Sequence, residues 1–121
     1  MCIPDTGIIE LKGMHFHAFH GCMEAEKVEG NEFVVDFRCR YDIKQAALDD
    51  DLNKTIDYSM IYLLVKTEMA RPSNLLENVA ARIFDTILKS YPKILEMELK
   101  VTKLNPPVEG TADSASVILT L

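Results

Sequence analysis

A long alternating segment in the first half of the chain constrains its fold more than any other feature. Apolar residues recur at every second position from Phe33 to Ile43, and charged residues stand between most of them. A period of two is typical of a β-strand with one buried face and one polar face. A strand this long needs partner strands and a covering layer, so the chain is expected to build a half-buried sheet.

Three further segments show the same period. In 8–19 the phase of the alternation changes around Gly13, which predicts a β-bulge, because one extra residue reverses the facing of those that follow. Segment 95–103 alternates until Asn105-Pro106-Pro107 ends the strand. The residues expected to face inward in the last two strands are Leu95, Met97, Leu99, Val101, Ala115, Val117, Leu119 and Leu121.

Two helices are expected between the second and third strands, and a loop is expected over 20–31. Tyr58–Met69 carries apolar residues at helical spacing. The next helix is expected to begin with Asn74 as its N-cap and with Glu77 closing a capping box. The order β-β-α-α-β-β predicts a single α+β domain over residues 1–121, in which two helices cover one face of a four-stranded antiparallel sheet.

Composition restricts the classes of function. The 121 residues are 48% apolar, which suits one globular domain, and no apolar stretch approaches the ~20 residues of a membrane span. A net charge of −6 argues against binding to nucleic acid. The N-terminus has no signal-peptide pattern, and the scattered cysteines indicate reduced thiols, so we expect a cytoplasmic protein with neither a membrane nor a nucleic-acid partner.

Lys103 is the most unusual residue of the pattern. It occupies the inward-facing parity of its strand, in line with Leu99 and Val101, directly before the Pro-Pro stop. One interpretation is a strand-end lysine whose ammonium reaches solvent. The other is an amine partly removed from water. Burial would then disfavour the ammonium form and make Lys103 a usable acid or base near neutrality.

All three histidines of the chain lie within six residues, at positions 15, 17 and 20. His15 and His17 share one face of the first strand and would make a metal pair, but zinc requires three or four ligands. His20 falls on the opposite parity, so solvent-facing strand histidines are the favoured interpretation.

Three other polar residues have both a structural and a chemical interpretation. Glu77 at a helix start either complements the helix dipole or holds the paired donors of a ligand. Glu26 lies in the 20–31 loop, where a glutamate is solvated by default. Tyr58 opens the first long helix, where its ring would pack and its hydroxyl would remain in water.

The short motifs of the chain, taken in order, resemble those of the dihydroneopterin aldolase family. The similarity extends over nearly the whole sequence, although the Ala70–Ser73 connection looks shorter than in some members, which bears on how the second helix presents Glu77. The motifs are Leu11–Phe16, His20-Gly21 with Glu26, Thr55–Tyr58, Asn74–Glu77 and Val101–Pro107.

The resemblance implies the tunnelling fold, in which subunits join their sheets into an oligomeric barrel. The usual assembly is a ring of four that stacks into a homo-octamer. The resemblance also implies a lyase of folate biosynthesis, which splits 7,8-dihydroneopterin into 6-hydroxymethyl-7,8-dihydropterin and glycolaldehyde. Neither a metal nor another cofactor nor a lysine Schiff base is required, because the N5=C6 imine of the dihydropterin accepts the electrons.

Residue roles also follow from the resemblance. Lys103 would be the acid/base residue, and Tyr58 would reach the site from a neighbouring subunit. Glu26 would lie near the side chain of the substrate. Glu77 would hold the 2-amino and N3–H edge of the pterin, with the Leu76 backbone beside it.

Three alternatives stay open at this point. A 2′-epimerase, acting on free or triphosphorylated dihydroneopterin, would use the same residues, because cleavage and re-addition to the other carbonyl face invert the carbon. A triphosphate would favour more basic residues than Lys27, the one lysine in 20–31. A zinc-dependent pterin synthase of the same fold would use the histidines. A non-catalytic pterin-binding ring would use none of this chemistry.

Overall fold

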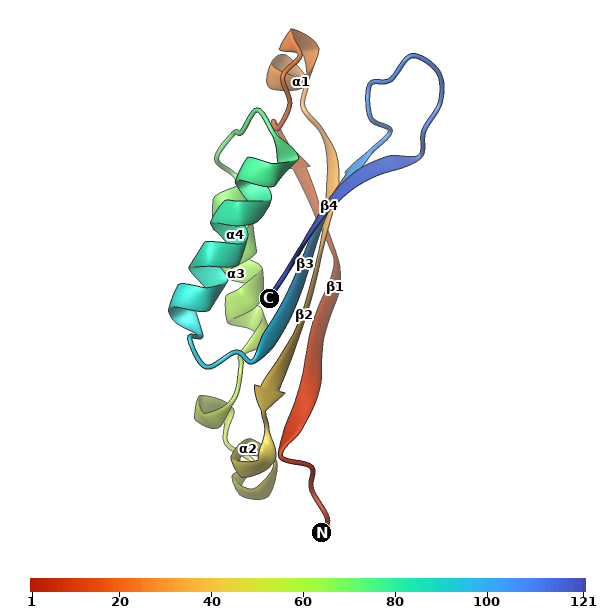
Figure 1. Cartoon of the computed structure of the whole chain (residues 1–121). Helices are drawn as coiled ribbons and strands as arrows, with labels where there is room; N and C mark the ends of the chain where they lie inside the picture. Colours follow the sequence, from red (N-terminus) through yellow and green to blue (C-terminus); the bar gives the residue numbers. More distant parts are fainter.

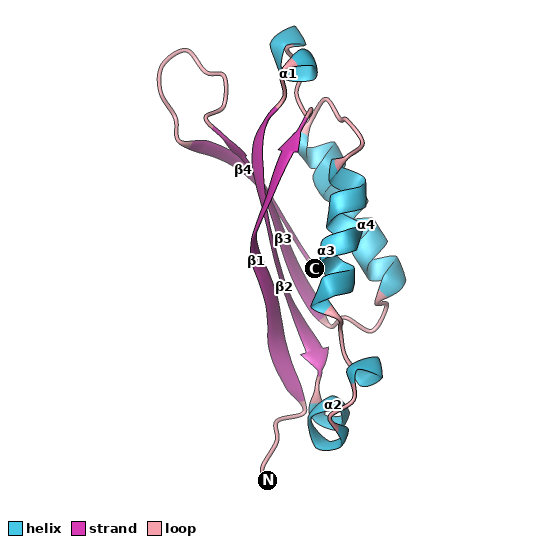
Figure 2. Ribbon diagram, turned by 180° about the vertical axis from the view of Figure 1, so that it is seen from behind, coloured by secondary structure: helices cyan, strands magenta, loops and turns pink.

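Four antiparallel strands form one sheet in the order β1-β2-β3-β4. The computed structural model describes all residues, 1–121. Helices α3 (Tyr58–Met69) and α4 (Leu76–Ser90) cover one face of the sheet, and the other face is left open (Figures 1 and 2). The α+β arrangement expected from the sequence is confirmed. The strands are Thr6–Ala18, Asn31–Asp42, Glu96–Leu104 and Ser114–Thr120.

Three short helices were not expected. α1 (Glu24–Val28) stands within the segment expected to be a loop, and α2 (Lys44–Asp49) and the 3-10 turn Leu52–Lys54 connect β2 to α3. Helices this short are not stable by themselves and depend on tertiary contacts, so the sequence pattern does not reveal them. α1 lies at the end of the sheet where β3 finishes and α4 begins, whereas α2 lies at the opposite end (Figure 1).

The core lies between the sheet and the two long helices. Four inward residues of β2, namely Phe33, Val35, Phe37 and Cys39, are at most 1% exposed, as the alternation predicts, whereas Tyr41 at the end of the row is only partly buried. Leu95, by contrast, is 53% exposed, because β3 begins only at the next residue. In the edge strand β4, Val117 and Leu119 pack against the core, whereas Ala115 and Leu121 are exposed. Of the four residues expected to face inward in this strand, only the two central ones do.

The β-bulge predicted at Gly13 is present. Leu11 pairs with Phe37 and Met14 pairs with Val35, so two residues of β1 stand opposite Asp36 alone. Gly13 has a φ of 70°, a conformation that glycine adopts without strain, and its N–H donates to the Asp36 carboxylate at 2.8 Å. The bulge turns Met14 and Ala18 toward the core.

The open face of the sheet is polar, as predicted. Cross-strand ion pairs join Arg38 to Glu10 at 3.7 Å and Arg40 to Glu96 at 3.2 Å. None of the helices has the length and apolar character needed to cross a bilayer.

Candidate active site

Lys103 and Glu26 form a buried ion pair where β3 ends. Their side chains are 11% and 10% exposed, which confirms the inward parity of Lys103. The ammonium also lies 5.8 Å from the ring centroid of Phe33, the residue paired with Lys103 on β2. The Glu26 carboxylate therefore supplies a counter-charge for an ammonium that is largely removed from water. The sequence interpretation considered burial alone, since nothing in the 20–31 segment marked Glu26 as the partner of Lys103.

The absence of a side chain at Gly21 leaves room for the Glu26 carboxylate. A Cβ at residue 21 would stand 2.3 Å from the Glu26 carboxyl carbon, much closer than real contacts allow. The other side of the carboxylate faces the N–H of Met23 at 3.4 Å. A larger residue at position 21 would therefore displace Glu26 from Lys103.

His20 ties the end of β1 to the connection between α3 and α4. Its ring is 1% exposed, and its Nδ1 accepts the N–H of Ser73 at 3.0 Å. The Gly21 N–H donates in return to the Ser73 carbonyl at 2.9 Å. Burial, followed by the charges of Arg82 and Lys103, lowers the His20 pKa to about 4. The ring is neutral at pH 7, and its proton is on the buried Nε2, because Nδ1 accepts the N–H of Ser73.

The other two histidines lie on the open face of the sheet. His17 is bonded through Nδ1 to the Glu32 carboxylate at 2.6 Å and through Nε2 to the Glu29 carbonyl at 2.9 Å. These two hydrogen bonds raise the pKa of His17. Since both of its ring nitrogens are occupied and His20 is buried on the other face, the histidines do not converge. The interpretation as solvent-facing residues holds for His15 and His17 and is wrong for His20.

Helix α4 begins later than expected. Leu75 is its N-cap, with extended φ and ψ of −116° and 144°, and Leu76 is the first helical residue. The expectation that Asn74 caps this helix and that Glu77 completes a capping box is wrong. Ser73 forms hydrogen bonds with His20 and Gly21, which hold the backbone before α4 against the end of β1. The helix therefore begins one residue later than expected. Glu77 remains in the first turn, exposed, and its carboxylate forms no hydrogen bond or ion pair within the chain.

A cavity of about 770 Å³ lies beside the ion pair. It opens between the segment that follows β1 and the start of α4, and Phe19, Asn74 and Asn78 contribute to its wall. Lys27 is the sole charged residue of the lining. Neither Lys103 nor Glu26 lines this cavity, so the cavity adjoins the ion pair through Gly21 without containing it. Glu77 does not line the cavity either.

Tyr58 is not brought to Lys103 within one chain. It is 62% exposed at the first residue of α3, which begins near α2, at the end of the sheet opposite to that of α1 (Figures 1 and 2). With Leu11, Tyr62 and Leu63 it borders an apolar depression of about 420 Å³.

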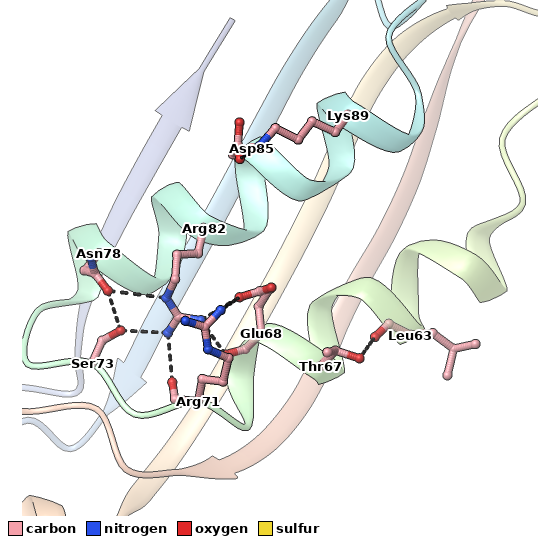
Figure 3. A network of polar contacts seen from close by, with 9 residues as sticks. All are labelled: Leu63, Thr67, Glu68, Arg71, Ser73, Asn78, Arg82, Asp85 and Lys89. Carbon is pink, nitrogen blue, oxygen red and sulfur yellow. Dashed lines mark hydrogen bonds and ion pairs between the residues drawn. The ribbon is translucent and has the colours of Figure 1, made fainter.

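Arg82 and Ser73 shape the site but had not been singled out in the sequence. Arg82 reaches from α4 to the Ser73 hydroxyl at 2.7 Å and to the Glu68 carboxylate at 2.6 Å (Figure 3). An arginine on an amphipathic helix looks like any solvent-facing residue, and no short motif marks it as an anchor for the preceding loop.

These observations define a class of protein, a small antiparallel α+β domain with a buried lysine–carboxylate pair near the start of its last helix. A family model described as "Dihydroneopterin aldolase" matches residues 9–120. The chain belongs to the dihydroneopterin aldolase family, and the resemblance found in the motifs is confirmed.

Individual relatives agree with this assignment. A dihydroneopterin aldolase of Staphylococcus epidermidis is 37% identical over 111 residues, covering 91% of this chain and 92% of that protein. One of Bacillus subtilis is 32% identical over 113 residues, covering 93% and 94%. The solved structure of Escherichia coli dihydroneopterin aldolase in complex with neopterin superimposes with a TM-score of 0.86 at 20% identity, over 95% of this chain and 98% of that one, and shows the same fold.

Proposed function

We propose that this protein is a lyase that cleaves 7,8-dihydroneopterin into 6-hydroxymethyl-7,8-dihydropterin and glycolaldehyde. The observation that carries the proposal is the buried Lys103–Glu26 pair in a chain of the dihydroneopterin aldolase family. Such a pair supplies a proton-transfer group that is held in place and shielded from water. The free thiols of Cys2, Cys22 and Cys39 support a cytoplasmic location.

The pterin ring is held at the start of α4. The 2-amino group and N3–H of a pterin form two parallel donors, which one carboxylate matches with two hydrogen bonds. Glu77 suits this role because it is exposed, stands in the first helical turn and has no partner within the chain. The backbone of Leu76, beside it at the helix start, adds a further contact to the ring edge.

The reaction is a retro-aldol cleavage. A base removes the proton of the 2′-hydroxyl, the C1′–C2′ bond breaks, and its electron pair passes into the conjugated N5=C6 imine. Glycolaldehyde leaves, and a proton delivered to C1′ completes the hydroxymethyl group. Lys103 moves these protons, directly or through water, and placed acid/base groups of this kind contribute about 10²–10⁴ in rate.

Glu26 serves both the lysine and the substrate side chain in this proposal. Its carboxylate holds the Lys103 ammonium in one position, and in the proposed complex it also contacts the hydroxyl groups of the substrate side chain. The chemistry requires no metal and no imine between substrate and protein, because the dihydropterin is its own electron acceptor.

Tyr58 would complete the site from a neighbouring subunit. Tyr58 is exposed and lies at the end of the sheet opposite to Lys103. Both observations support a homo-oligomer in which the start of α3 in one subunit meets the Lys103 end of the sheet in another. Several exposed apolar side chains gather at this end of α3, among them Met60, Tyr62 and Leu63. We propose rings of four subunits, stacked as an octamer, with the sheets joined into a barrel.

The cavity beside the site favours the unphosphorylated substrate. A triphosphate carries several negative charges and is bound by clusters of arginine and lysine, whereas Lys27 is the one charged residue in the cavity lining.

One assay tests the proposal. Purified protein is incubated with 7,8-dihydroneopterin in the presence of a metal chelator, and glycolaldehyde and the pterin products are quantified. Equimolar glycolaldehyde and 6-hydroxymethyl-7,8-dihydropterin are expected, and borohydride added during turnover should trap no adduct on Lys103. Formation of the 2′-epimer alone would favour an epimerase. Turnover that appears only when the chelator is left out would favour a metal-dependent enzyme, and absence of turnover in both conditions would favour a pterin-binding ring.

A further inference from the structure

We propose that Arg82 is a positioning residue of this site, which fixes the start of α4 and therefore the place of Glu77 relative to Lys103. The inference rests on the proposed function, in which Glu77 binds the pterin and Lys103 transfers protons. Arg82 touches neither of them. It acts on the connection between α3 and α4, from which the pterin-binding end of α4 emerges.

The guanidinium of Arg82 joins three parts of this connection (Figure 3). At the end of α3 it donates to the Glu68 carboxylate at 2.6 Å and to the Glu68 carbonyl at 3.0 Å. In the loop it donates to the Arg71 carbonyl at 2.8 Å and to the Ser73 hydroxyl at 2.7 Å. Its Nε reaches Asn78 of α4 at 3.3 Å, and Asn78 in turn accepts from the Ser73 hydroxyl at 2.7 Å.

This set of partners needs arginine. A guanidinium presents five N–H donors in a fixed plane, whereas a lysine ammonium is a single point with three donors. The Arg82 side chain is 18% exposed and the Glu68 side chain 13%, so the charge pair is largely removed from water. Lysine at this position could keep the ion pair with Glu68, but it could not also hold the Arg71 carbonyl and the Ser73 hydroxyl.

The anchored loop touches the other half of the site. Ser73 exchanges backbone and side-chain hydrogen bonds with His20 and Gly21, and Gly21 packs against the carboxylate of Glu26. The loop therefore connects the start of α4 to the segment that carries the partner of Lys103. Releasing the loop from Arg82 would change the distance between the pterin-binding end of the site and its proton-transfer end.

The test compares Arg82→Lys and Arg82→Met with the wild type. KM and kcat for 7,8-dihydroneopterin are measured together with the Kd of neopterin and the thermal midpoint. We expect KM and Kd to rise at least about tenfold in both variants, since a charged hydrogen bond to the pterin is worth roughly 1.5–3 kcal/mol. Arg82→Lys keeps the pair with Glu68 and is expected to retain most of the stability, so a rise in its KM cannot be assigned to unfolding.

Lys89→Met is the matched control. Lys89 lies on the same helix and pairs with Asp85 at 2.8 Å, but it is exposed and distant from the loop (Figure 3). Its loss should leave KM, kcat and Kd unchanged. Ser73→Ala, which removes only the hydroxyl that Arg82 holds, should raise KM by less than Arg82→Lys.

A fall in the thermal midpoint or in kcat with unchanged KM and Kd would overturn the inference, because a smaller folded fraction lowers kcat without changing affinity. The proposed function fails separately, if the wild type releases no glycolaldehyde. The Kd of neopterin still tests the role of Arg82 in that case.

Discussion

Replacing Lys103 by methionine tests the ion pair and the chemistry together. The change removes the buried ammonium and leaves the Glu26 carboxylate, 10% exposed, without a counter-charge. A glutamate in water has a pKa of about 4.3, so binding a proton at pH 7 costs about 4 kcal/mol. Because Glu26 can always bind a proton, this cost is a ceiling for the penalty of its unpaired charge, and it agrees with the roughly 3–5 kcal/mol found when one partner of a buried pair is removed.

The pH dependence of the loss identifies its cause. In the folded variant the unpaired carboxyl binds a proton more readily than in the unfolded chain, so the variant regains stability as the pH falls. The difference from the wild type should shrink by about 1.4 kcal/mol per pH unit, to about 1 kcal/mol at pH 5. A packing defect would show no such dependence.

A double variant, Lys103→Met with Glu26→Gln, separates stability from catalysis. The neutral amide needs no counter-charge, so most of the lost free energy of unfolding should return. Turnover should nevertheless remain about 10²–10⁴ below the wild type, because the acid/base group is absent. The affinity for neopterin should change much less in both variants.

Guanidinium denaturation at pH 7 and pH 5, at one fixed protomer concentration, measures these differences. Equal destabilisation at both pH values would refute the account of the buried carboxylate. Near-normal turnover in either variant would remove Lys103 from the chemistry and leave it a structural residue.

Three further predictions concern the rest of the site. Glu77→Gln places a donor opposite the donors of the pterin and should weaken neopterin binding roughly tenfold to a hundredfold, as a titration would show; unchanged affinity would contradict its role. Tyr58→Phe co-expressed with Lys103→Met should recover activity at about a quarter of the sites, provided that Tyr58 acts between subunits; each variant alone should stay inactive. Wild-type stability should decline as the pH falls from 6.5 toward about 4, because His20 binds a proton at a higher pH in the unfolded chain than in the folded protein. His20→Asn can still accept the Ser73 N–H and should flatten that part of the stability profile.

The sequence by itself determined the sheet and the orientation of its residues. The alternation over 33–43 determined which face of β2 is buried, and the change of phase at Gly13 predicted the bulge. The inward parity of Lys103 marked it as unusual before any partner was known. These features depend on the period of a strand, which is local and can be read directly from the chain.

Only the tertiary structure decided which residues meet. Glu26 is 77 positions from Lys103, and His20 is 53 positions from Ser73, so neither pair leaves a trace in local periodicity. The late start of α4 and the short helix α1 have the same origin, because both are held by contacts made elsewhere in the fold. Period and capping preferences act over a few residues, whereas the geometry of this site depends on hydrogen bonds and charges that only the packing of α4 and α1 against the end of the sheet brings together.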